Sequence, residues 1–91
     1  MTTKDAIIEA IKERLGYGYM VGTIWDEKVE VDGFTEERYI FTIEDVDAHV
    51  DIRENELRFE YRIHGTDKYS GLSYPKTLKG LVGKIERVVK R

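Results

Sequence analysis

The residues from Asp47 to Arg62 alternate strictly between apolar and polar side chains. Such alternation is typical of half-buried strands. A turn at Glu54-Asn55 would place two strands opposite each other, and a slip of one residue would expose the apolar set. Opposite charges across an antiparallel pair stabilise by roughly 0.2–1 kcal/mol each. The pattern therefore predicts one register, with the pairs Ile52–Leu57, Val50–Phe59, Ala48–Tyr61, Arg53–Glu56, Asp51–Arg58, His49–Glu60 and Asp47–Arg62.

A helix is predicted at each end of this sequence. Near the N-terminus the apolar positions follow helical spacing, which predicts a helix over about 4–15, with Thr2 as its cap and Gly16 as its stop. Near the C-terminus, Ser73 is the expected cap and Pro75 lies in the first turn. The apolar stripe there predicts a helix over about 75–90 through Leu78, Leu81, Val82, Ile85, Val88 and Val89.

Two further strands are expected before the central hairpin. An aromatic and β-branched stretch predicts a strand over about 17–31, and Asp32-Gly33 is a hairpin turn signal. The next strand is expected over about 37–44, followed by strands over about 47–53 and 56–63. The fold class is therefore α+β, in the order α-β-β-β-β-α. A four-stranded antiparallel meander over residues 1–91, taken as one domain, would carry both terminal helices on one face.

The composition limits the cross-links that this domain can form and the cellular compartment in which we expect it. The chain has no cysteine, which excludes disulfides and thiolate metal sites. No apolar run has the length of a membrane span, and the N-terminal residues do not resemble a signal peptide. These observations predict a cytoplasmic protein with no membrane partner. They indicate no cofactor.

Charge is distributed unevenly along the chain. Residues 1–64 hold 8 Lys and Arg against 16 Asp and Glu, whereas residues 65–91 hold 7 against 2. The simplest interpretation is that a basic helix lies beside an acidic sheet and that the two neutralise each other. The alternative is that one end of the molecule binds an anion or that the sheet faces a partner.

Candidate catalytic and metal sites are weak in this sequence. Ser70, Ser73, His64 and Asp67 are close along the chain, but catalytic triads are assembled by the fold and not by local clustering. His49 is flanked by acidic residues, yet each of these has an expected partner across the hairpin. We therefore expect no catalytic residue, no metal site and no enzymatic activity.

The first hairpin holds the strongest candidate for a binding surface. A turn at Asp32-Gly33 would place Trp25 opposite Ile40 and Thr23 opposite Thr42. Without a bulge, the face turned away from the helices would then carry an apolar patch, whereas a bulge near Asp26-Glu27 would bury Trp25. Exposed apolar patches with Trp and Tyr are typical of protein interfaces. The sequence therefore predicts a non-enzymatic interaction module that binds a protein or itself through Tyr19, Val21, Trp25 and Ile40.

Two alternatives remain open from the sequence. In the first, the basic C-terminal helix binds nucleic acid; Gly80 and Gly83 would leave a flat helix face beside Lys76, Lys79, Lys84, Arg87 and Arg91. In the second, the acidic meander imitates a phosphate backbone and blocks a nucleic-acid-processing enzyme. In size and charge the chain is similar to small acidic phage inhibitors. The acids concerned are Glu27, Glu30, Asp32, Glu36, Glu37, Glu44, Asp45, Asp47 and Asp51.

Overall fold

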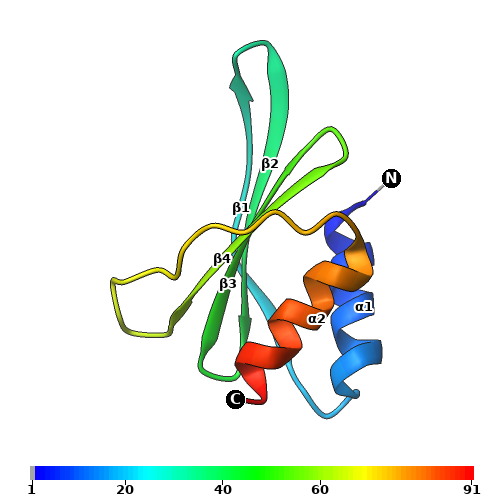
Figure 1. The fold of residues 1–91 in the computed structure, drawn as a ribbon, viewed down its shortest axis with the longest axis vertical. Helices are drawn as coiled ribbons and strands as arrows, with labels where there is room; N and C mark the ends of the chain where they lie inside the picture. The colour runs from blue at the N-terminus through cyan, green and yellow to red at the C-terminus, as the bar shows by residue number, and fades with distance from the viewer. Residues whose placement is uncertain (1) are drawn as a thin grey trace.

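The computed structural model describes residues 2–91 and confirms the α+β fold class (Figure 1). The elements follow in the predicted order, and the four strands form one antiparallel meander in which each strand pairs with the next. Their bounds are α1 Lys4–Leu15, β1 Val21–Val31, β2 Phe34–Ile43, β3 Val46–Arg53, β4 Glu56–Ile63 and α2 Leu78–Val89.

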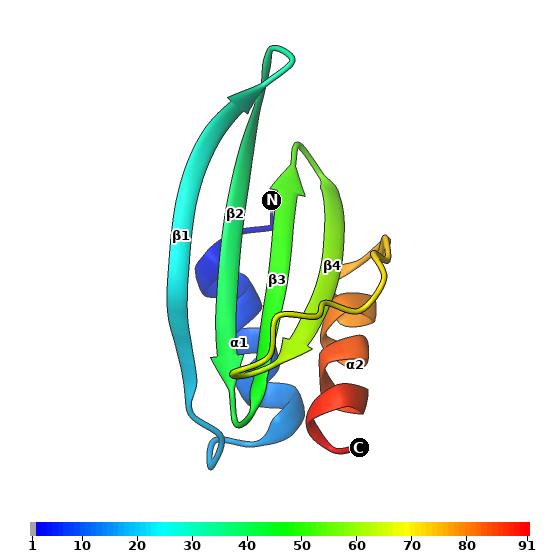
Figure 2. The same cartoon turned by 90° about the vertical axis from the view of Figure 1, so that its left-hand side faces the viewer.

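Both helices pack on one face of the sheet, which we call the helix face (Figure 2). The core lies between them and the sheet, and Phe41, Ile43 and Val50 are fully buried within it. The opposite side, which we call the outer face, is turned toward the viewer in Figure 2. The helix residues that enter the core are Ile7, Ile11 and Leu15 of α1 and Leu81, Val82 and Ile85 of α2.

The register of the β3–β4 hairpin is as the alternation predicts. All seven predicted pairs are present, and Val46 also pairs with Ile63. The turn at Asp32-Gly33 also forms, with φ of 51° and 82° at its two residues. Positive φ at both central residues is what a tight hairpin turn requires, and Gly33 adopts it without steric cost. Beyond the pair Glu36–Arg53, the β1–β2 hairpin extends past β3 and β4 (Figure 2).

Element boundaries differ from the predicted ones at the helix caps. Thr3, and not Thr2, caps α1 by accepting a hydrogen bond from the Ala6 N–H at 3.1 Å. Thr77, and not Ser73, caps α2 in the same way, so this helix begins at Leu78. Ser73 instead exchanges two backbone hydrogen bonds with Phe59 of β4. Ser73 is therefore part of an edge pairing, which holds it away from the helix start.

The segment that follows β4 crosses the outer face before it reaches α2 (Figure 2). Its Tyr69 ring lies 6.0 Å from the His49 ring and 5.2 Å from the Arg62 guanidinium. The segment then runs along the free edge of β4, where the Ser70 N–H donates to the Tyr61 carbonyl at 2.7 Å. One edge of the sheet is therefore covered, while β1 forms the other. Among residues 2–91 there is no helix with both the length and the apolar character needed to cross a membrane.

Candidate interaction surfaces

The outer face is organised as rows of side chains that run across the four strands. One row contains Trp25, Ile40, His49 and Glu60 from β1 to β4, because these residues are paired in register. The next two rows are charged, and they consist of Glu27, Arg38, Asp51 and Arg58, followed by Val29, Glu36, Arg53 and Glu56. Trp25 therefore lies at the apolar edge of a charged surface.

The structure contains a β-bulge at Ile24, and because of it the predicted apolar patch does not form as a whole. Trp25 pairs with Ile40 as expected, but Thr23 pairs with Phe41 and not with Thr42. Because one extra residue in a strand reverses the alternation on one side of the bulge, residues before Ile24 point to the opposite face. Val21 consequently packs against the core on the helix face, and Tyr19, which precedes β1, also packs against the core. The four predicted residues do not form one surface.

Trp25 nevertheless remains on the outer face and exposed. Its relative exposure is 52%, and the neighbouring Ile24 is 49% exposed. The alternative prediction, that a bulge near Asp26-Glu27 buries Trp25, is therefore wrong, since the bulge lies earlier in the strand. The Trp25 indole N–H donates to a Glu27 carboxylate oxygen at 3.2 Å. Phe34, 43% exposed, lies farther along the same hairpin.

A fully buried carboxylate organises the charged rows. The Glu36 side chain has no exposed surface, although it lies on the outer face. Arg53 donates to it at 2.9 Å, Arg58 also donates to it, and Arg38 lies 3.5 Å away. Burial alone would raise the pKa of Glu36, but these guanidinium groups lower it below its ordinary value. Glu36 therefore stays ionised and holds three arginines in place.

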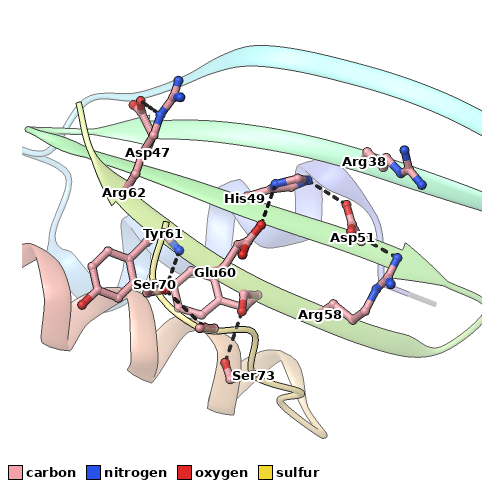
Figure 3. Close-up of polar contacts among 12 residues, drawn as sticks. Arg38, Asp47, His49, Asp51, Arg58, Glu60, Tyr61, Arg62, Ser70 and Ser73 are labelled. Carbon is pink, nitrogen blue, oxygen red and sulfur yellow. Dashed lines mark hydrogen bonds and ion pairs between the residues drawn. The ribbon is translucent and has the colours of Figure 1, made fainter. Parts of the chain in front are cut away.

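Asp47 is a second buried carboxylate on the outer face (Figure 3). It accepts hydrogen bonds from Arg62 at 3.0 Å and Thr42 at 3.1 Å, and His64 lies 3.1 Å away. Burial would raise the pKa of Asp47, but the hydrogen bonds from Arg62 and His64 outweigh it and lower the pKa. The segment after β4 therefore attaches to the sheet through His64 and Tyr69.

His49 lies between two carboxylates, in the place that the alternation predicts (Figure 3). One ring nitrogen is 3.0 Å from Asp51 and the other is 3.5 Å from Glu60. The hydrogen bond to Asp51 raises the pKa of His49, and burial opposes this only in part. Asp51 also pairs with Arg58 at 3.2 Å. Within residues 2–91, no group of three or more acidic or histidine side chains is arranged to hold a metal ion.

The basic residues predicted for nucleic-acid binding separate into two sets. Arg91 forms an ion pair with Asp45 at 2.6 Å, and Lys76 lies in a pocket beside Glu56, near the β3–β4 turn. The other three lie together along one open groove of about 460 Å³, which we call the α2 groove. Its lining residues are Arg14, Thr77, Lys79, Gly80, Gly83, Lys84 and Arg87.

Arg14 is the member of this groove that the sequence did not indicate. It belongs to α1 and donates to Glu86 of α2 at 3.0 Å, which holds it across the helix pair. No pattern within one element would find it, because the contact joins residues that are 72 positions apart.

The acids of the inhibitor hypothesis are mostly engaged within the chain. Of the nine, Glu36, Glu37, Asp45, Asp47 and Asp51 form ion pairs with its own basic residues. Imitation of a phosphate backbone needs exposed, unpaired negative charge, so this geometry favours the hypothesis less than the other two. Comparisons with protein-family models, curated proteins and solved structures found no match for this chain.

Proposed function

We propose that this chain is a protein-interaction module whose outer face, along β1 and β2, binds a partner protein. The observation that carries the proposal is the half-exposed Trp25 on a face where ion pairs hold the surrounding side chains. Tryptophan, tyrosine and arginine are over-represented among the residues that dominate the binding energy of protein interfaces. A face whose side chains are already fixed also loses less conformational entropy on binding.

The charges beside Trp25 suggest the chemistry of the partner. Glu36 is fully buried, and the Asp51 side chain is only 13% exposed, while the Arg38 and Arg58 side chains are 37% and 31% exposed. The arginine side chains of this network are therefore more exposed than the two carboxylates with which they pair. We expect a partner that presents an apolar side chain to Trp25 and carboxylates to the arginines.

A matched pair of substitutions tests this proposal. Leu72 is 52% exposed, as Trp25 is, but it lies in the segment beside β4. Immobilised wild-type protein and the Leu72→Glu variant should retain the same protein from a lysate, and Trp25→Glu should lose it. Trp25 is the only tryptophan in the chain, so its fluorescence should shift to shorter wavelength when the purified partner covers it.

The same variants test whether the partner is a second copy. Sedimentation over a concentration series should then show self-association of the wild type and of Leu72→Glu, but not of Trp25→Glu. Circular dichroism checks that each variant is folded, as expected for exposed positions. Equal retention by Trp25→Glu and wild type, or an unchanged emission spectrum in the complex, would contradict the proposal.

A further inference from the structure

The basic residues of this chain differ sharply in whether they have an acidic partner. Of its 15 Lys and Arg residues, nine form ion pairs. Every Lys or Arg that lies in a strand has such a partner. Among residues 2–91, the six that have none are Lys12, Lys68, Lys76, Lys79, Lys84 and Arg87. Three of these six line the α2 groove.

The α2 groove contains no acidic residue in its lining, although the chain as a whole is acidic. Lys84 is partly buried there, and no carboxylate within residues 2–91 forms an ion pair with it. The groove is therefore suited to an anion that comes from outside the chain.

The floor of the groove is formed by glycine. Gly80 and Gly83 are both interior to α2, and no side chain projects from them. Each glycine inside a helix costs about 1 kcal/mol relative to alanine. At Gly83 a tight helix contact does not require glycine, because the nearest atom to a Cβ there would be an Arg14 nitrogen at 3.9 Å. Gly83 therefore leaves open space beside backbone and cationic groups.

A second groove lies on the other side of Lys84 and Arg87. It has a volume of about 270 Å³, and both cations line it together with Tyr61, Ser70 and Ser73. Lys84 and Arg87 therefore form a ridge with a hollow on each side. A linear ligand with repeated negative charges can cross such a ridge and meet cations and hydroxyl groups in succession.

We propose that the α2 groove binds the phosphate backbone of a nucleic acid, with Lys79, Lys84 and Arg87 neutralising the phosphates. Arg14 adds a fourth cationic side chain to the same groove, but Glu86 already offsets its charge. An acidic protein is a poorer fit, because the α2 groove has no aromatic residue in its lining and protein interfaces are usually anchored by such residues. The groove is separate from the outer face, so this activity is independent of protein binding there.

Fluorescence anisotropy with a short labelled single-stranded DNA tests the proposal at several salt concentrations. Each neutralised phosphate of a single strand contributes about −0.7 to the slope of log K against log salt, so three contacts give roughly −2. The variant Lys84→Gln/Arg87→Gln should bind more weakly and keep a slope of roughly −0.7. The control variant Lys12→Gln/Lys68→Gln has the same net charge but leaves the groove intact, and it should bind as the wild type does.

Two competitors identify the chemistry of the ligand. Polyglutamate and inorganic phosphate, each at matched ionic strength, should displace the DNA less well than unlabelled DNA does. Absence of binding at low salt, equal loss in both double variants, or equal displacement by polyglutamate or phosphate would overturn the proposal. Arg87→Gln against Lys68→Gln, both at exposed positions, repeats the comparison if the double variant fails to fold.

Discussion

Replacement of Gly83 by alanine should stabilise this protein. The residue lies inside α2, where glycine costs about 1 kcal/mol relative to alanine because it leaves the unfolded chain more freedom. A new Cβ would have only ordinary van der Waals contact, with the Arg14 guanidinium at 3.9 Å. We therefore expect a gain of about 1 kcal/mol, which in a domain of this size raises the melting temperature by roughly 4–8 °C.

Gly80→Ala provides the matched control within the same helix. Its Cβ would lie 3.2 Å from the Thr77 hydroxyl oxygen, which accepts the Gly80 N–H at 3.0 Å and so caps the helix. Displacement of a cap costs about 1 kcal/mol, which offsets the gain in helix propensity. We expect the free energy of unfolding of Gly80→Ala to remain close to that of the wild type.

Urea unfolding followed by far-ultraviolet circular dichroism measures both variants against the wild type. A destabilised Gly83→Ala, or an equal change in the free energy of unfolding at the two glycines, would show that helix propensity at Gly83 and capping at Gly80 do not act as argued. The same variant also bears on nucleic-acid binding. A methyl group on the floor of the α2 groove keeps a phosphate farther from the backbone, so Gly83→Ala should bind DNA more weakly although it is more stable.

Three further predictions concern the sheet. Glu36→Gln leaves three arginines without their buried counter-ion and should cost about 3 kcal/mol in urea unfolding, whereas the exposed Glu56→Gln should change stability by less than about 0.5 kcal/mol. The pKa of His49 is raised above its ordinary value of 6.5, so its stabilising contribution is complete below that pH and is lost as pH rises through the raised pKa; unfolding measured across this range should show a decline in the wild type that is absent from His49→Gln. Gly33→Ala places a side chain at a φ of 82° and should destabilise by about 1 kcal/mol, while Gly71→Ala, where φ is not positive and nothing lies within 4 Å, should be nearly neutral on the same urea assay.

The β3–β4 hairpin could be predicted in full because two independent signals agree on one register. Apolar alternation selects Val50 opposite Phe59, and charge pairing selects Asp51 opposite Arg58. Both depend only on residues close along the chain. The turn at Asp32-Gly33 was predictable for the same reason, since its backbone conformation follows from local steric preference.

The composition of the outer surface could not be predicted because it depends on contacts between distant segments. A bulge at Ile24 adds one residue, and no local pattern in a glycine-containing strand specifies where it falls. The strand position of Glu36 also predicts a side chain that faces solvent, yet arginines from β3 and β4 cover it and it is fully buried. The same holds for Arg14, whose place in the α2 groove depends on how the two helices pack.

The arrangement of ion pairs bears on the charge asymmetry between the two parts of the sequence. The simplest expectation from the sequence is that the basic helix and the acidic sheet neutralise each other. Among the described residues, however, one ion pair joins the C-terminal end of the chain to the sheet and its turns, from Arg91 to Asp45. Glu36, Asp47 and Asp51 are instead paired with arginines of the sheet itself. Since the sheet pairs its most buried carboxylates with its own arginines, Lys79, Lys84 and Arg87 have no acidic partner among the described residues. These three positive charges can therefore bind an external anion without loss of an ion pair within the chain. Because each phosphate that they neutralise adds to the salt dependence of binding, the salt dependence of DNA binding is the measurement that tests this arrangement most directly.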